Sequence, residues 1–206
     1  MSSGILLVLS APSGTGKSTL CQALADRRAD VRLSVSCTTR PPRPSEAEGR
    51  DYFFVSEAEF QARIQRGDLL EWARVHGHFY GTPRGPIEGH RGKGLNVVMN
   101  IDTQGARSIK KAFPDSVLVF IAPPSWRVLE ERLRGRNQDD EATIQRRLVN
   151  AREEMAQAPH YDYLVVNENV QAAVDELAAI LSAEHRRVAR LAKEPEGLTL
   201  FGPARS

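Results

Sequence analysis

A glycine-rich stretch that ends in a lysine and a serine has the residue types needed to bind a chain of phosphates. It reads APSGTGKS over residues 11–18 and fits the Walker A pattern, except that Ala11 stands where the pattern has its first glycine. Glycines allow successive backbone N–H groups to point inward around phosphate oxygens, and a helix that begins directly afterwards adds the positive end of its dipole. Lys17 can then reach the β- and γ-phosphates, while the Ser18 hydroxyl can ligate Mg²⁺. We therefore expect a nucleoside triphosphate to contact Ala11, Pro12, Ser13, Gly14, Thr15, Gly16, Lys17, Ser18 and Thr19.

Arginines gather in two further stretches of the chain. Arg40, Arg43 and Arg50 lie in and just after a proline-rich segment, and a second group lies between residues 132 and 147. Arginine binds phosphate through parallel charge-assisted hydrogen bonds, so local clusters suit phosphate groups better than a diffuse basic surface does. The prolines between Arg40 and Arg43 stiffen that segment, which lowers the entropy cost of aiming two side chains at one anion. The alternative for both groups is a set of solvated surface arginines.

The elements expected to position these groups alternate between strands and helices. The apolar run Ile5–Leu9 is typical of a central parallel strand covered on both faces, and it leads directly into the phosphate loop. Ser56 and Glu59 form a capping-box pattern that predicts the start of a helix, and residues 80–83 predict a turn into another. Further strands are expected at residues 33–36, 51–55, 69–75, 95–101, 116–121 and 163–166, and further helices at 18–29, 104–112, 125–133, 144–155 and 170–190.

This alternation predicts an α/β fold with a parallel β-sheet of the P-loop NTPase type, flanked by helices. In such sheets the ligands lie beyond the carboxyl ends of the strands. The 206 residues suffice for one core of ordinary size. Short, β-rich segments indicate an inserted subdomain at residues 37–90, so we expect the core at 1–36 and 91–190, a lid at about 126–158 within it, and a tail at 191–206.

Composition argues against several classes of protein. A hydrophobic content of 41% and a charged content of 26% are typical of a globular chain, and a net charge of +2 is too small to indicate a nucleic-acid-binding protein. Cys21 and Cys37 lack the spacing of a metal site or of a disulfide framework. The apolar run near the N-terminus is too short to span a membrane. We expect a cytoplasmic protein with reduced cysteines and with no nucleic-acid or membrane partner; the sequence leaves open a monomer or a homo-oligomer.

Seven segments, taken in order, resemble the guanylate kinases. They are SVSCTTRPPR at 34–43, GRDYFFV at 49–55, LEWA at 70–73, YGT at 80–82, IDTQG at 101–105, IAPPS at 121–125 and LRGR at 133–136. The resemblance extends from about Ile5 to Leu181, which makes it more specific than the phosphate loop alone. It implies a kinase that uses ATP with Mg²⁺ and transfers the γ-phosphoryl group to GMP or dGMP, giving ADP and GDP (or dGDP), in purine metabolism and GMP recycling.

The resemblance also implies roles for single residues. Guanine offers N1–H and N2–H₂ as donors and O6 as an acceptor, so the carboxylates of Glu71 and Asp102 would accept from the base while the hydroxyls of Ser36 and Thr82 donate to O6. Such a site rejects adenine by a factor on the order of 10⁴, because buried polar groups would be left unpaired. The GMP phosphate would be held by Arg40, Arg43, Tyr52 and Tyr80. The transferring phosphoryl group would be contacted by Lys17, Arg43, Arg136 and Arg147, with Arg132 as a further candidate. Asn167 would contact adenine, while Arg134 and Arg146 are expected on the helix surface.

Asn100 departs from the family, which usually has an acidic residue two positions before Asp102. An amide can still hydrogen-bond to a magnesium-bound water but brings no negative charge, so we expect weaker Mg²⁺ affinity rather than loss of activity.

Three other functions compete with this interpretation. They are a kinase for another phosphorylated acceptor such as a ribose bisphosphate, a regulatory ATPase or GTPase, and a non-catalytic guanylate-kinase-like module that binds peptides. The first would not need Glu71 and Asp102 together, and the second leaves the guanine-site segments unexplained. The third resembles proteins with degraded phosphate loops, whereas Lys17 and Ser18 are both present here.

Overall fold

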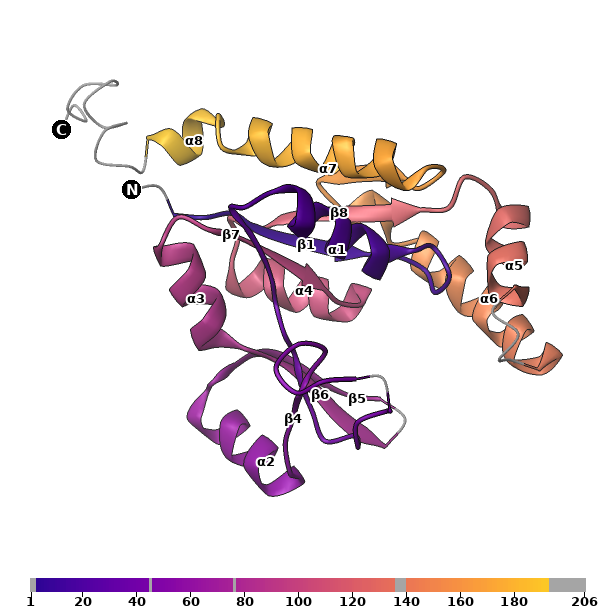
Figure 1. The fold of residues 1–206 in the computed structure, drawn as a ribbon, viewed down its shortest axis with the longest axis horizontal. Coiled ribbons are helices and arrows are strands. Elements are labelled where there is room, and N and C mark those ends of the chain that lie inside the picture. The colour runs from indigo at the N-terminus through magenta and orange to yellow at the C-terminus, as the bar shows by residue number, and fades with distance from the viewer. Residues whose placement is uncertain (1–2, 45, 76, 136–139, 193–206) are drawn as a thin grey trace.

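A five-stranded, all-parallel β-sheet forms the centre of the molecule. The computed structural model describes residues 3–44, 46–75, 77–135 and 140–192. The strands run in the order β2-β7-β1-β8-β9, with β1 in the middle (Figure 1). Their bounds are β1 Leu6–Ser10, β2 Val31–Leu33, β7 Asn96–Asn100, β8 Val117–Ala122 and β9 Tyr163–Val166. This confirms the predicted parallel sheet.

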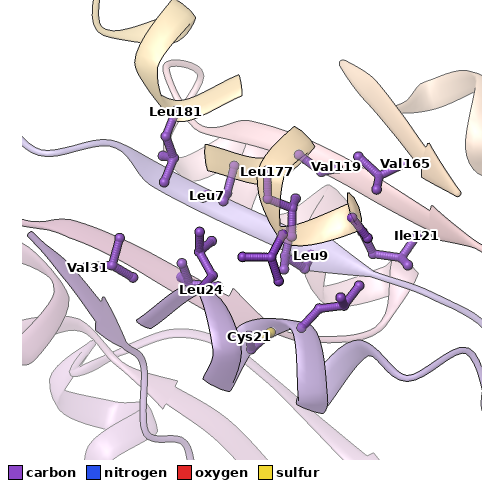
Figure 2. Packing of buried hydrophobic residues seen from close by; sticks show 14 of the residues in the cluster. Leu7, Leu9, Cys21, Leu24, Val31, Val119, Ile121, Val165, Leu177 and Leu181 are labelled. Carbon is purple, nitrogen blue, oxygen red and sulfur yellow. The ribbon is translucent and has the colours of Figure 1, made fainter. Parts of the chain in front are cut away.

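Helices cover both faces of this sheet, as its strand sequences require. Successive side chains of a strand point to opposite faces, so a strand that is apolar throughout needs a cover on each. Leu7 and Leu9 of β1 pack with α1 (Lys17–Arg27) and α7 (Val170–Glu184), as Figure 2 shows. Leu6 and Val8 pack on the other face, with α3 (Arg84–Gly92) and α4 (Thr103–Ala112).

A smaller mixed sheet lies below the main one in Figure 1. Its order is β4-β3-β6-β5, and its strands are β3 Cys37–Thr38, β4 Phe53–Phe54, β5 Leu69–Val75 and β6 His78–Pro83. Phe60 of α2 (Glu57–Arg66) is buried against it. The side chain of Ser56 accepts the Glu59 N–H, so the predicted helix start is confirmed. The predicted turn at residues 80–83 is wrong, because these residues pair with β5 and form the end of β6.

Two helices beyond the carboxyl ends of the main strands form a third, small unit. They are α5 (Trp126–Arg134) and α6 (Glu141–Met155), followed by a 3₁₀ turn at Ala158–His160. Ser125 caps α5 by accepting the Val128 N–H, and Asp140 caps α6 by accepting the Thr143 N–H. Leu129, Leu133 and Ala151 are buried between the two helices, which gives this unit an apolar core of its own.

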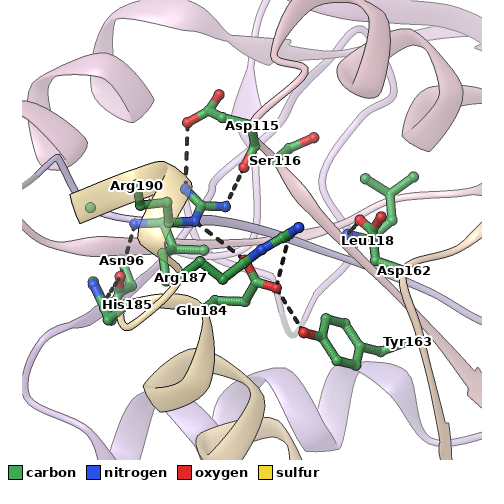
Figure 3. Close-up of polar contacts among 12 residues, drawn as sticks. Asn96, Asp115, Ser116, Leu118, Asp162, Tyr163, Glu184, His185, Arg187 and Arg190 are labelled. Atoms are coloured by element: carbon green, nitrogen blue, oxygen red, sulfur yellow. Dashed lines mark hydrogen bonds and ion pairs between the residues drawn. The ribbon is translucent and has the colours of Figure 1, made fainter. Parts of the chain in front are cut away.

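A network of polar side chains fixes the C-terminal end of the described chain. The predicted helix at 170–190 is two helices, because α7 ends at Glu184 and α8 spans Val188–Leu191. Glu184 is 1% exposed and accepts a hydrogen bond of 2.7 Å from the Tyr163 hydroxyl, and its carboxylate also pairs with Arg187 and Arg190 (Figure 3). Most of the predicted tail, residues 193–206, lies outside the described residues.

Candidate active site

The phosphate loop lies between the end of β1 and the start of α1. Gly14 and Gly16 have φ values of 89° and 90°, a backbone conformation that favours glycine. A Cβ on Gly16 would also lie 2.8 Å from the side-chain nitrogen of Asn167. Because Gly16 is the N-cap residue, no side chain caps the first N–H groups of the 11-residue helix α1. The start of α1 therefore presents backbone N–H groups without a side-chain cap, and the positive end of the helix dipole, to an anion.

Lys17 lies in a cavity of about 300 Å³ that is lined by the loop and by Asp102 and Glu154. Its ammonium donates to the Ile101 carbonyl at 2.6 Å. Burial lowers the pKa of Lys17, while the charges of Asp102 and Glu154 counter part of that shift. At the same cavity, the amide nitrogen of Asn100 donates to the Ser18 hydroxyl at 3.0 Å. The predicted ATP-binding segment thus lines a pocket that contains the Lys17 ammonium and the Ser18 hydroxyl.

Asn167 and Arg132 support the loop from behind. Asn167 is 3% exposed and its side-chain nitrogen donates to the Thr15 carbonyl at 2.7 Å, while its side-chain oxygen is buried without a partner among the described residues. Arg132 donates to the carbonyl of Asn167 at 3.1 Å. Both side chains therefore contact the backbone of the loop region; the expected contact of Asn167 with adenine stays a prediction.

A second cavity, of about 230 Å³, holds the carboxylates expected to bind guanine. Its lining includes Ser36, Glu71 and Asp102. Asp102 is the N-cap of α4, and its Oδ1 accepts the Gly105 N–H at 2.7 Å. A Cβ on Gly105 would lie 3.4 Å from this Oδ1 and 3.4 Å from Oε2 of Glu71, so the two carboxylates lie close together at one side of the cavity.

Thr82 lies behind Glu71 and does not line the cavity. It is fully buried, and its hydroxyl donates to Glu71 at 2.6 Å. The expected contact of Thr82 with guanine O6 stays a prediction. The Ser36 hydroxyl, 3.5 Å from that of Thr82, lines the cavity instead. Burial raises the pKa of Glu71, the Thr82 hydrogen bond lowers it, and the charge of Asp102 raises it further.

Both cavities have Asp102 in their walls, so they adjoin each other at the carboxyl end of β7. Asn100 lines the second cavity and also contacts Ser18 in the first. The two cavities therefore lie side by side, with Asp102 between them.

Arg40, Tyr52 and Tyr80 are brought together at the mouth of the second cavity. The Arg40 guanidinium lies 5.6 Å from the centre of the Tyr52 ring, and the Tyr52 and Tyr80 rings meet edge to face with 6.0 Å between centres. Arg40 also donates to both oxygens of Glu46, at 2.8 and 2.9 Å. Arg43 has an exposed side chain, and its backbone N–H donates to Glu46 at 2.8 Å. The structure thus places three of the four predicted phosphate ligands together.

The lid residues are only partly described. Arg136 lies outside the described residues, and Arg147 is a half-buried side chain of α6. Arg134 pairs with Glu130 and Glu141 on the surface, as predicted for a surface arginine.

Sequence reasoning missed two acidic residues, Glu46 and Glu154. Glu46 follows Arg43 by three residues, and the Arg43 N–H and the Arg40 guanidinium hold the pKa of Glu46 below its usual range. Glu154 follows Arg147 by seven residues, which is two helical turns, so both lie on the same face of α6. That spacing is a signal that could have found Glu154.

The oxygen atoms around Ser18 suit a magnesium ion that arrives with a nucleotide. Mg²⁺ keeps several waters and binds through few protein oxygens plus substrate phosphates. Within the described residues, no group of three or more His, Cys, Asp or Glu side chains could hold a metal by itself. The Ser18 hydroxyl and the Asn100 amide fit this kind of site, although the 3.0 Å hydrogen bond uses one lone pair of Ser18.

Comparison with known proteins gives one consistent result. Residues 3–184 match the family described as guanylate kinase. The chain is 46% identical to the guanylate kinase of Thermotoga maritima over 91% of its own length and 90% of that protein's, and 44% identical to that of Myxococcus xanthus over 97% and 96%. The crystal structure of guanylate kinase from Anaplasma phagocytophilum is similar with a TM-score of 0.78 and 35% identity, covering 100% of this chain and 98% of that one. In the described part of the chain, no helix is long and apolar enough to cross a membrane.

Proposed function

This chain belongs to the guanylate kinase family. We propose that one of its two cavities binds the phosphoryl donor and the other binds the acceptor. The enzyme transfers the γ-phosphoryl group of ATP to GMP. The cavity at the phosphate loop binds the donor, and the cavity at Glu71 binds the acceptor. The observation that carries this assignment is that Asp102 lines both cavities, so that they adjoin. In-line transfer requires two nucleotides bound next to each other, with the GMP phosphate at Arg40, Tyr52 and Tyr80 turned toward the donor phosphates at Lys17.

The donor cavity binds phosphates through backbone N–H groups and Lys17. The uncapped start of α1 and the loop glycines supply donors, and Lys17 supplies the charge. Asn167 and Arg132 act through the loop backbone and hold it in place for the phosphates. Ser18 would help to hold Mg²⁺, and the ion would neutralise charge on the donor phosphates.

The acceptor cavity selects guanine through Glu71, Asp102 and Ser36. Thr82 donates to one oxygen of Glu71, so the other oxygen is left to accept from the guanine N1–H or N2–H₂. Asp102 accepts the second donor of the base, and Ser36 donates to O6. Because these groups are assigned to the base and not to the 2′ position of the sugar, we expect dGMP to be an acceptor as well.

The GMP phosphate binds where Arg40, Tyr52 and Tyr80 meet. A dianionic phosphate forms stronger bonds with a guanidinium than one carboxylate does, so it competes with Glu46 for Arg40. Arg43, exposed in the structure, then turns inward to complete the clamp and to contact the transferring group.

Transfer itself depends on positioning and on stabilisation of charge, since phosphoryl transfer needs little covalent help from the protein. Lys17 and Arg43 flank the transferring group, and Arg147 and Arg136 approach from the lid. Closure of α5 and α6 excludes water, so the acceptor oxygen of GMP reacts and ATP is not hydrolysed. We place the enzyme in the cytoplasm, as the sequence led us to expect.

An ADP-release assay with GMP, dGMP, AMP, CMP and UMP as acceptors tests the assignment. We expect release with GMP and dGMP, and release with AMP lower by orders of magnitude. ADP release that does not depend on an acceptor, or a preference for AMP, would contradict the proposed acceptor cavity.

A further inference from the structure

A carboxylate from the lid helix lies in the cavity that binds the donor phosphates. Glu154 of α6 lines this cavity together with the phosphate loop and Lys17. Burial raises the pKa of Glu154, while the charge of Lys17 and the backbone N–H of Ser13 both favour its charged form. Glu154 is half-buried, unlike its neighbour Glu153, which is exposed. The charged or titratable groups that face Glu154 from other elements include Lys17 of α1, Asp102 at the start of α4 and Tyr161, and Arg107 of α4 lines a neighbouring cavity together with Glu154.

These partners of Glu154 are the groups that the donor phosphates require. A phosphate chain in the loop needs the Ser13 N–H and the Lys17 charge, and it carries several negative charges of its own. The Ser13 N–H and the Lys17 ammonium can pair with the carboxylate or with a phosphate oxygen. A carboxylate and a phosphate that are both bound in this partly desolvated cavity would repel each other. A carboxylate and a triphosphate therefore compete for the same groups.

Glu154 is also linked to the lid. It lies two helical turns from Arg147 on the same face of α6. Ala151, between them in sequence, is fully buried against α5. A shift of α6 that carries Glu154 away from the loop therefore also carries Arg147 with it.

We propose that Glu154 is an internal anion that occupies part of the donor cradle in the free protein and is displaced by the donor phosphates. The displacement frees α6 to rearrange, so donor binding and the position of Arg147 are coupled through one carboxylate. Glu154 is then a positioning residue: it lowers the affinity for the donor, and it links donor binding to the position of Arg147. The inference rests on the proposed donor cavity.

Calorimetric titration of ADP, without Mg²⁺, into four forms of the full chain tests the displacement. If Glu154 occupies the phosphate-binding groups in about nine-tenths of the free protein molecules, its removal raises the affinity for ADP by about tenfold. Glu154→Gln and Glu154→Ala should both show this rise, while the affinity for adenosine, which has no phosphate, stays unchanged. The exposed Glu153→Gln is the matched control and should bind ADP as the wild type does.

A purely structural role for Glu154 gives a different pattern. Glutamine still accepts the Ser13 N–H, so Glu154→Gln would bind ADP like the wild type and Glu154→Ala would bind it more weakly; that result overturns the proposal. Lys17→Ala separates failure of the inference from failure of the donor assignment, because equal ADP binding by Lys17→Ala and wild type would contradict the donor cavity itself.

The NMR signal of the Ser13 amide gives a second readout. It should differ between wild type and Glu154→Gln in the free proteins and coincide when both are saturated with ADP, since the phosphates then hold this N–H in each. A difference that persists at saturation would mean that Glu154 is not displaced. Thermal melting checks that each variant is folded.

Discussion

Replacing Glu71 by glutamine should damage recognition of guanine and leave the donor cavity intact. In the structure, one Glu71 oxygen accepts the Thr82 hydroxyl at 2.6 Å, and the other is available to the base. In the Glu71→Gln variant, the new side chain would keep its oxygen on Thr82 and turn its NH₂ group toward the guanine donors. The base then loses a hydrogen bond to a charged acceptor and faces an unpaired donor, which together cost about 2–4 kcal/mol. This corresponds to a loss in kcat/KM for GMP of about 30- to 900-fold.

The ADP-release assay measures this effect with GMP and with AMP at saturating ATP. The glutamine NH₂ can donate to the N1 of adenine, so kcat/KM for AMP should be unchanged or higher and the preference for GMP should fall by at least about tenfold. The KM for ATP should not change. Glu176→Gln, an exposed carboxylate on α7, is the control for removal of one negative charge. An unchanged ratio of GMP to AMP use in Glu71→Gln would refute the role of Glu71 in reading guanine.

Further predictions concern the donor cavity, the lid and pH. Lys17→Ala should lower kcat by about a thousandfold or more without unfolding the protein, measured by ADP release and thermal melting; residual activity near the wild-type level would show that Lys17 does not contact the transferring group. Asn100→Asp should lower the Mg²⁺ concentration needed for half-maximal activity, because a carboxylate accepts the Ser18 proton where the amide now donates to its lone pair; an unchanged magnesium titration would remove this idea. Arg147→Ala should lower kcat by about a hundredfold with little change in the KM for GMP, and a change confined to KM would assign it to binding. Burial raises the pKa of Glu71, so kcat/KM for GMP should begin to fall on acidification at a higher pH than an ordinary glutamate would cause. Because the pKa of Glu71 is higher in the folded state than in the unfolded state, its charged carboxylate destabilises the fold at pH values above the folded-state pKa. This destabilisation disappears as the pH falls below the unfolded-state pKa, so Glu71→Gln should be at least as stable as wild type at neutral pH.

The main sheet and its phosphate loop could be predicted because their signals are local. The apolar run of β1, the glycines that follow it and the helical period after Lys17 all lie within one short segment. The same holds for the cap at Ser56. In these places the side chains alone determine what the backbone does.

The smaller sheet was harder to predict, because its pairing is not local. The predicted strand at 33–36 is divided: the Ser34 N–H still donates to Val98 in the main sheet, while the Ser36 carbonyl accepts from Phe53 in the smaller one. Residues 80–83 have the composition of a turn and yet form a strand, since β5 supplies a partner. The partner of a short strand cannot be read from the strand itself.

The family pattern predicted which residues form the site, whereas only the structure shows which side chains fix them in place. Glu71 beside Trp72 has the sequence of an ordinary surface strand; it is the fully buried Thr82 that shows how its carboxylate is fixed. Glu46 was missed because an acidic residue near arginines has no distinctive local pattern. The spacing of Glu154 from Arg147 puts both on one helix face, but the sequence does not show what that face meets. Only the fold brings Glu154 to Lys17.

The most direct test of the two adjoining cavities is the affinity of a bisubstrate analogue in which adenosine and guanosine are joined through a polyphosphate bridge. Because Asp102 lines both cavities, the analogue should occupy them together and bind at least about a hundredfold more tightly than ADP or GMP alone. Lys17→Ala and Glu71→Gln should each weaken it. The account would be contradicted if the analogue bound no more tightly than the single nucleotides, or if neither substitution weakened its binding. Either result would mean that the donor and the acceptor do not bind next to each other in these two cavities.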